Sequence, residues 1–183
     1  MLERAAVVAG ETVLITGASG GVGSALMQLV QARCAHAIAV VGRNKQHHAR
    51  ALGAIQVIPR ETDDINTLLE NTRVDVVADV VGGAGIDALM HIVRPGGRIV
   101  TAGAIAGAIV EIDLRTLYLR HLSLLGSTLG TAKDFANLVK TIEAGLVKPL
   151  VAHTFPLEQL REAQQTFEQK QFFGKIVIDR FHA

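Results

Sequence analysis

Short runs of apolar, mostly β-branched residues recur along the chain and predict six β-strands. These runs occupy residues 12–16, 36–41, 55–58, 74–81, 98–102 and 122–125. The second and fourth runs, which contain AIAVV and VVADVV, are almost continuously apolar and do not alternate with polar residues. That pattern is typical of strands whose two faces are both covered by helices. We therefore expect a six-stranded parallel sheet.

Segments with the periodicity of amphipathic helices separate the strand segments. In one of them, Ile86, Leu89, Met90 and Val93 follow an i, i+3, i+4, i+7 spacing, and the turn at residues 95–97 is expected to end the helix. Strands and helices alternate in this way for most of the chain. The alternation predicts an α/β protein with a doubly wound Rossmann fold, in which helices flank the sheet.

A later helix carries its own start and stop signals. It is predicted from Ala132, with Thr131 and Asp134 spaced like a capping box and Gly145 as the residue just beyond its end. Its apolar stripe consists of Phe135, Leu138, Val139 and Ile142. The sequence therefore predicts a capped amphipathic helix at the end of the alternating pattern.

The pattern changes after this helix and divides the chain into two parts. We expect a dinucleotide-binding Rossmann domain at residues 1–145 and an appendage at residues 146–183, since a chain of 183 residues has room for one sizeable core. The appendage is predicted as an extended stretch, a helix and a strand, at residues 148–155, 157–169 and 175–179. Residues 1–8 look like the end of a helix.

Composition and charge exclude several classes of protein. The net charge of +1 and the few aromatic residues, six Phe and one Tyr, disfavour nucleic-acid binding. The apolar fraction of 49% excludes disorder, and no apolar run is long enough for a membrane span, so we expect no membrane partner. The single cysteine, Cys34, is expected on a helix, packed and inert. A lone cysteine fits a reducing, cytoplasmic location.

The histidines show no spacing that suits a metal ion, and we expect them on the surface or on helix faces. This expectation concerns six of the seven histidines: His47, His48, His91, His121, His153 and His182. Asp79, at the end of a buried strand, is predicted to accept hydrogen bonds from loop N–H groups, although a contact with a cofactor is an alternative. No metal site is predicted in this chain.

The first strand runs directly into a glycine-rich turn and then into a helix. Read as GxGxxG, the turn matches at Ala18, Gly20 and Gly23, with alanine in the first glycine position. Glycines allow the backbone to approach a pyrophosphate, and the helix N-terminus offers free N–H groups with a partial positive charge. A tight strand-to-helix turn without a ligand is the alternative, but its place at the head of the alternating strands favours nucleotide binding.

The same residues also fit TGxxxGxG, the pattern of short-chain dehydrogenases. Those enzymes need a tyrosine followed four residues later by a lysine, but Leu122 stands four residues after Tyr118, the single tyrosine. A methyltransferase generally needs an acid after the second strand for the ribose hydroxyls, and that acid is missing as well. Both classes are therefore disfavoured.

The end of the second strand indicates which dinucleotide is bound. An NAD site usually carries an acid here to hold the ribose 2′-hydroxyl, whereas this chain has Gly42 followed by Arg43 and Lys45. These residues favour NADP(H). The alternative is that the two cationic side chains lie on an exposed loop and contact no ligand.

The chain as a whole resembles the cofactor domain of medium-chain dehydrogenases/reductases, of the quinone oxidoreductase and zinc-type alcohol dehydrogenase-like branch. The resemblance covers nearly the whole chain and is carried, in order, by GETVLITGASGGVGSALMQL, ARALGA, DVVADVVGG, RPGGRIVTAG, DLRTLYLRHLSLLGSTLGT and FFGKIVI. It implies an NADP-dependent oxidoreductase that transfers hydride between the nicotinamide and a carbonyl, an activated alkene or a quinone.

The resemblance also implies which residues surround each part of the cofactor. The pyrophosphate would lie against Ser19, Gly20, Gly21 and Val22; the 2′-phosphate against Gly42, Arg43 and Lys45; and the adenosine against Val81 and Gly82. The nicotinamide half would lie among Ala102, Gly103, Ala104, Gly126, Ser127, Thr128, Phe173, Gly174 and Lys175. Lys175 could equally be a solvated lysine at the start of a strand.

Members of this family carry an N-terminal barrel-like catalytic domain, which this sequence lacks. We therefore expect either a fragment or a chain that is completed by another polypeptide, and its partner surface should be exposed. A small-molecule substrate would be held by the missing half, so we expect little activity from this chain alone. A non-catalytic NADP(H)-binding module and a methyltransferase remain alternatives. The uncharged residues 122–125 should form a sheet edge through which a homodimer pairs.

Overall fold

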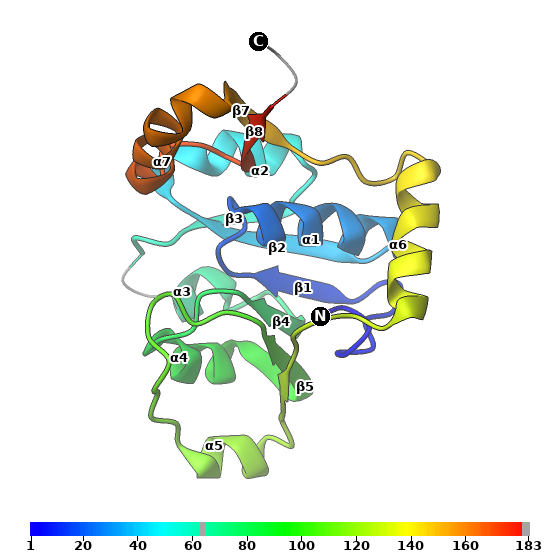
Figure 1. Cartoon of the computed structure of the whole chain (residues 1–183). Helices are drawn as coiled ribbons and strands as arrows, with labels where there is room; N and C mark the ends of the chain where they lie inside the picture. The colour runs from blue at the N-terminus through cyan, green and yellow to red at the C-terminus, as the bar shows by residue number, and fades with distance from the viewer. Residues whose placement is uncertain (63–64, 181–183) are drawn as a thin grey trace.

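A computed structural model describes residues 1–62 and 65–180, and Figure 1 shows the arrangement of the elements. The strands are β1 (Thr12–Ile15), β2 (His36–Val41), β3 (Gln56–Pro59), β4 (Val74–Asp79), β5 (Val93–Thr101), β6 (Ser123–Gly126), β7 (Val151–Pro156) and β8 (Lys175–Asp179). The α-helices are α1 (Gly21–Ala32), α2 (Gln46–Ala51), α3 (Ile65–Leu69), α4 (Gly85–Ile92), α5 (Leu114–Leu119), α6 (Ala132–Glu143) and α7 (Leu160–Gln169). Single turns of 3₁₀-helix precede α2 and α7, at Arg43–Lys45 and Leu157–Gln159.

The main sheet confirms the predicted doubly wound architecture. In the part of the chain that the structure describes, its six strands are all parallel and lie in the order β3-β2-β1-β4-β5-β6. The order reverses between β1 and β4, and such a reversal opens a crevice beyond the carboxyl ends of the strands. β6 lies at the sheet edge, as the sequence predicted.

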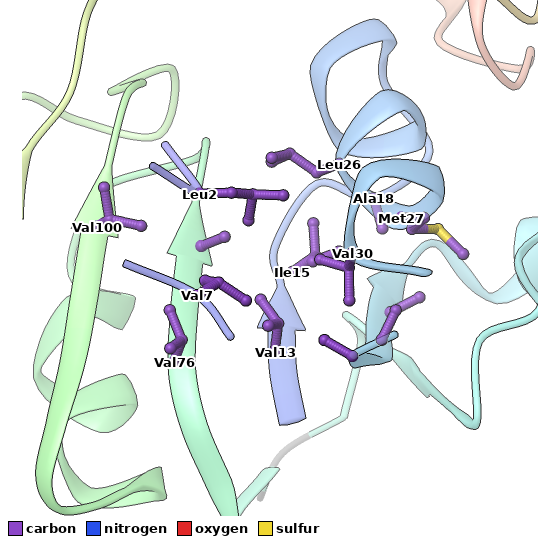
Figure 2. Packing of buried hydrophobic residues seen from close by; sticks show 14 of the residues in the cluster. Leu2, Val7, Val13, Ile15, Ala18, Leu26, Met27, Val30, Val76 and Val100 are labelled. Carbon is purple, nitrogen blue, oxygen red and sulfur yellow. The ribbon is translucent and has the colours of Figure 1, made fainter. Parts of the chain in front are cut away.

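Both faces of this sheet are buried, which explains the nearly continuous apolar runs of the central strands. On β1, Val13 and Ile15 face a cluster that includes Met27 and Val30 of α1, while Leu14 faces the opposite cluster with Met90 of α4. Figure 2 shows the first cluster, in which the side chains of α1 lie against those of β1. A helix on each face therefore fixes the position of the loops that follow the strands.

The capping signals of α6 are confirmed. The Thr131 side chain accepts a hydrogen bond from the Asp134 N–H, and the Asp134 side chain accepts one from the Thr131 N–H. Gly145, with φ of 72°, lies two residues after the end of the helix at Glu143 and donates its N–H to the carbonyl of Ile142 over 2.8 Å. The helix is thus defined by local hydrogen bonds at both ends, although none of its residues is fully buried.

The prediction of a helix end at residues 1–8 is wrong. This segment forms turns, because Ala6 adopts a positive φ of 47° and reverses the chain after a single helical hydrogen bond from Ala5 to Met1. The turns place Leu2 and Val7 in the core. Figure 2 shows both side chains among those of β1, β4 and α1.

The expectation for Cys34 is also wrong. α1 ends at Ala32, and Cys34 lies in the following turn with φ of 56° and an exposed side chain. The turn is needed to lead the chain into β2, and it points the thiol away from the core. Cys34 is therefore neither helical nor packed.

β5 begins earlier than predicted. The sequence placed a turn at residues 95–97 and the strand from Arg98, whereas the strand extends over Val93–Thr101. Gly96 adopts φ of 71°, and the pairing with β4 shifts register between Val74 and Val76. The proline and glycines therefore form an irregularity inside the strand.

The appendage forms a second, small layer against the Rossmann core. β7 and β8 pair in parallel as a two-stranded sheet, and α7 connects them, as the predicted strand-helix-strand order required. Two hydrogen bonds join Gln28 of α1 to the backbone of Lys148, at 2.8 and 3.0 Å. Figure 1 shows this layer beside α2 and above the sheet. No helix among the described residues is both long enough and apolar enough to cross a membrane.

Candidate functional site

A large cleft lies beyond the carboxyl ends of the parallel strands. It has a volume of about 1910 Å³ and is bounded by the loops after β1, β2, β4, β5 and β6 and by the appendage. Most of the residues that sequence analysis proposed for the cofactor line it: Ser19, Gly20, Gly21, Val22, Gly42, Lys45, Val81, Gly82, Ala102, Gly126, Ser127, Thr128, Gly174 and Lys175. The topology thus brings together residues from five loops and the appendage.

The glycine turn between β1 and α1 is too tight for side chains at two positions. Gly17 has φ of 58°, and a Cβ atom at Gly23 would lie 2.3 Å from the Gly17 carbonyl oxygen. The Gly20 N–H donates to the same oxygen over 3.0 Å and closes the turn. This geometry leaves the first turn of α1 facing the cleft, where its N–H groups form a site suited to an anion.

Lys175 places a positive charge over this helix terminus. A Cβ atom at Gly21 would lie 2.7 Å from the Nζ atom of Lys175, so the ammonium group approaches the backbone where a side chain is missing. The neighbouring Gly174 has φ of 101° and donates its N–H to the carbonyl of Ser19 over 3.0 Å. The start of β8 therefore forms one wall of the glycine turn, and Lys175 itself is an exposed residue there.

Asp79 organises the loop after β4. Its side chain is buried, with 1% of its surface exposed, and accepts hydrogen bonds from the N–H groups of Val81 and Gly82 over 3.2 and 3.0 Å. The Thr101 hydroxyl donates to it over 2.9 Å and joins the end of β5 to the same carboxylate. These contacts confirm the prediction that Asp79 accepts hydrogen bonds from loop N–H groups.

A cluster of basic side chains lies at the end of the cleft nearest β2 and β3. Lys45 donates to the backbone carbonyl of Lys170 over 2.5 Å, and Arg60 lines the cleft beside them. Burial lowers the pKa of Lys45, and the charges of Arg60 and Lys170 lower it further. The concentration of positive charge suits a phosphate group, which would relieve this repulsion.

Sequence analysis missed Arg60 and Lys170 at this end of the cleft. Arg60 follows β3, which lies next to β2 in the sheet. Because the carboxyl ends of neighbouring parallel strands lie at the same edge of the sheet, its place at this end of the cleft could have been predicted. Lys170 comes from the end of α7, and its position depends on how the appendage packs. No pattern in the sequence predicts that contact.

A carboxylate also lies in this region, beside Gly42. Glu61 accepts a hydrogen bond from the Arg43 backbone N–H over 3.0 Å and pairs with Arg60 at 3.1 Å. Burial raises the pKa of Glu61, but the hydrogen bonds from its own backbone N–H and that of Arg43, together with the Arg60 charge, outweigh it and leave the pKa below its usual value. Sequence analysis missed this residue too.

The Arg43 side chain is exposed and does not line the cleft.

Three further proposed residues, Gly103, Ala104 and Phe173, do not line the cleft. A Cβ atom at Gly103 would lie 2.4 Å from the Val80 carbonyl oxygen, so the backbones of the β4 and β5 loops are in direct contact there, and Ala104 packs beside Gly82. Phe173 is buried, and its ring stacks on His48 with 5.2 Å between the centroids. Their positions indicate that these residues support the loops.

The described residues bring no metal-binding cluster together. Across residues 1–62 and 65–180, no group of three His, Cys, Asp or Glu side chains is arranged to hold a metal ion. Tyr118 is 60% exposed on α5, and Cys34 is exposed in its turn. His182 lies outside the described residues. The site thus offers anion-binding groups and a long cleft.

These features match one family of proteins. The family described as zinc-binding dehydrogenase matches residues 52–178. The chain belongs to this family. It is similar to the C-terminal, cofactor-binding domain of medium-chain dehydrogenases/reductases, as the sequence motifs indicated.

Two curated relatives illustrate the family. Acryloyl-coenzyme A reductase of Metallosphaera sedula is 29% identical over 178 residues, which cover 97% of this chain and 53% of the relative. Human quinone oxidoreductase is 28% identical over 176 residues, which cover 90% of this chain and 53% of the relative. The chain therefore spans about half the length of the curated relatives it matches.

Solved structures agree with this assignment. A protein from Sinorhizobium meliloti that is assigned to the alcohol dehydrogenases superposes with a TM-score of 0.93 at 49% identity, covering 98% of this chain and 51% of that chain. A 2-octenoyl-CoA carboxylase reductase in complex with NADP and 2-octenoyl-CoA superposes with a TM-score of 0.86 at 28% identity, covering 95% of this chain and 44% of that chain. The family name implies zinc, but the described residues offer no ligand set for it.

Proposed function

We propose that the chain is the NADP(H)-binding domain of an oxidoreductase that transfers hydride between a nicotinamide and a carbonyl, an activated alkene or a quinone. The observation that carries the proposal is the ammonium group of Lys175, which lies over the first turn of α1 at Gly21. A cation and a helix N-terminus that face the same cleft suit a pyrophosphate. The NADP complex of the reductase structure supports the choice of cofactor.

Each part of the cofactor has a matching part of the cleft. Ser19 and the α1 N-terminus would hold the pyrophosphate, Lys45 and Arg60 the 2′-phosphate, and the loops after β5 and β6 the nicotinamide half. When bound, the cofactor supplies the hydride. The chain's own residues would bind it and would hold its nicotinamide half among the loops after β5 and β6.

The class of substrate follows from the relatives. One is a quinone oxidoreductase and another an acryloyl-coenzyme A reductase, so both act on electron-poor acceptors. We propose an acceptor of this kind, held by protein outside these 183 residues. The exposed apolar stripe of α6, which includes Phe135 at 68% exposure, supports a further packing partner on this side of the molecule.

We also propose that two copies of the chain pair through β6. The strand lies at the sheet edge, and Leu124 is 41% exposed there. Leu119 and Tyr118 of α5, the helix that precedes β6 in the chain, are 67% and 60% exposed. An uncharged edge strand with apolar neighbours favours pairing with a copy of itself.

A non-catalytic NADP(H)-binding module is the second candidate. It is favoured by the positions of Tyr118 and Cys34, which are both exposed and do not line the cleft. Both candidates require cofactor binding, and they differ in whether a complete assembly turns over.

The test measures binding and turnover separately. NADPH fluorescence titration of the 183-residue chain should show saturable binding, while S-adenosylmethionine should show none by calorimetry. Steady-state NADPH oxidation with quinones, enals or acryloyl-coenzyme A should be negligible for these 183 residues alone, because they span about half the length of the relatives that they match. Absence of NADPH binding, or binding of S-adenosylmethionine, would overturn the proposal.

A further inference from the structure

The space that Gly42 leaves at the end of β2 is surrounded by side chains of this chain. A Cβ atom at position 42 would lie 3.3 Å from Asn44 Oδ1, 3.6 Å from Glu61 Oε1 and 3.9 Å from Arg60 Nη2. A glycine here is expected to make room for the 2′-phosphate of NADP(H). The structure instead places a carboxylate of the protein at the border of that room.

The donors that hold Glu61 are those that a phosphate would use. The Arg43 backbone N–H donates to Oε2 over 3.0 Å, and Arg60 Nε donates to Oε1 over 3.1 Å. Carboxylates and phosphates accept the same charge-assisted hydrogen bonds from guanidinium and backbone groups. Glu61 and a 2′-phosphate therefore compete for one set of donors.

We infer that Glu61 is an internal competitor of the 2′-phosphate and sets how strongly this domain prefers NADP(H) over NAD(H). The inference rests on the proposed cofactor binding. To bind NADP(H), the Glu61 carboxylate must leave the two donors and turn toward solvent. To bind NAD(H), it can stay and accept a hydrogen bond from the ribose 2′-hydroxyl, as acids after the second strand do in NAD sites.

The surroundings of Glu61 allow both arrangements. Its side chain is 41% exposed and that of Arg60 is 72% exposed, so the carboxylate can swing out without disturbing the core. Lys45 and Lys170 remain nearby as cations for a phosphate. The site thus combines a basic cluster that favours the extra phosphate with one acid that opposes it.

Removal of the Glu61 charge should therefore raise the affinity for the 2′-phosphate. Glu61→Gln keeps the length of the side chain and an acceptor for the Arg43 N–H, but it removes the like charge. One charge-assisted hydrogen bond corresponds to roughly a 10-fold change in affinity. We expect NADPH to bind about 10-fold more tightly to Glu61→Gln and NADH to bind equally or more weakly.

The experiment titrates NADPH and NADH, and also adenosine 2′,5′-bisphosphate and adenosine 5′-monophosphate, which report on this end of the cleft without the nicotinamide. The proteins are wild type, Glu61→Gln, Glu61→Ala and a matched control, Glu158→Gln, which removes a charge from an exposed residue outside the cleft. Thermal melting confirms that each variant is folded.

The outcomes separate the inference from the proposed function. The inference is supported if the ratio of NADPH affinity to NADH affinity rises in both Glu61 variants. The preference for the bisphosphate over the monophosphate should rise by the same factor, and neither ratio should change in the control. An unchanged ratio in folded variants overturns it and leaves cofactor binding intact, since Glu61 would then serve only as an ion-pair partner of Arg60. Failure of wild type and variants alike to bind any of the four nucleotides overturns the proposed function.

Discussion

The hydroxyl group of Thr16 donates a hydrogen bond to Oδ1 of Asp79 over 2.6 Å and joins the end of β1 to the end of β4. The same hydroxyl oxygen accepts the Val80 N–H over 3.1 Å. Thr16 is 8% exposed, so both hydrogen bonds are largely shielded from water. The bond therefore fixes the two strand ends between which the glycine turn and the β4 loop open.

Replacement of Thr16 by valine should destabilise the protein, because the Val80 N–H would lose its partner and Asp79 Oδ1, which also accepts the Val81 N–H, would lose one of its two donors. We expect a loss of about 1 to 3 kcal/mol in the free energy of unfolding, measured by urea denaturation. Thr16→Ser should retain most of the stability, and Thr154→Val, at an exposed position on β7, should change it little. A Thr16→Val protein as stable as wild type would show that water replaces the hydroxyl at no cost.

Replacement of Lys175 by alanine should weaken NADP(H) and NAD(H) to a similar degree, because the pyrophosphate is common to both. A reduction of about 10-fold is expected from the loss of one charge-assisted contact, and Lys175→Arg should retain most of the affinity. Lys140→Ala, an exposed lysine of α6 outside the cleft, is the control. Fluorescence titration measures both affinities. A Lys175→Ala variant that lost affinity for NADPH but not for NADH would contradict the assignment of Lys175 to the pyrophosphate.

Acid should destabilise the protein partly through Asp75. Burial raises the pKa of this carboxyl, but hydrogen bonds from Arg94, the Thr12 N–H and Arg73 outweigh burial and leave the pKa below 3.8, its usual value. Since the folded pKa is the lower one, the contribution to stability is complete above pH 3.8 and is lost as the pH falls through the folded pKa.

Asp75→Asn should therefore be less stable than wild type at neutral pH, and the difference should shrink as the pH falls below about 4. Thermal melting between pH 7 and pH 3 measures both effects. Glu143→Gln, at an exposed end of α6, should follow wild type at every pH. A difference between Asp75→Asn and wild type that stays constant across this range would show that charge at Asp75 contributes nothing.

A charge on the edge strand should prevent dimer formation. We expect the wild-type chain to sediment as a dimer at micromolar concentration and Leu124→Lys to sediment as a monomer, because the lysine would face its own copy across the paired strands. Leu157→Lys adds the same charge at a site in the appendage that is 52% exposed, and it should leave the dimer unchanged. Sedimentation of wild type as a monomer would remove the basis for pairing through β6.

The sheet and the glycine turn could be predicted from sequence because their signals are local. Continuous apolar runs indicate strands that are covered by helices on both faces of the sheet. The steric limits at Gly17 and Gly23 arise within a single strand-to-helix connection. The α6 caps were found for the same reason, since Thr131 and Asp134 are three residues apart and bond to each other.

The features that sequence analysis missed depend on contacts between distant segments or on backbone conformations without a residue signature. Glu61 and Lys170 reach the β2 loop from β3 and α7, and Lys170 is 125 residues from Lys45. Cysteine is not a typical residue for the positive φ that Cys34 adopts, so nothing in the sequence indicated its turn. Glycines that usually mark a loop instead form an irregularity within β5.

The hydrogen bonds that join the appendage to the Rossmann core have a consequence for how the chain opens. The Gly174 N–H is bonded to Ser19, Gln28 to Lys148, and Lys45 to Lys170, so hydrogen bonds hold the two layers together at the edge of the cleft. Local opening of such a layer costs less free energy than global unfolding, and a ligand that touches both sides makes it rarer. The appendage should therefore resist a protease better as the fraction of molecules that carry a dinucleotide increases. Limited proteolysis would then measure how much of the cleft is occupied, without any measurement of turnover.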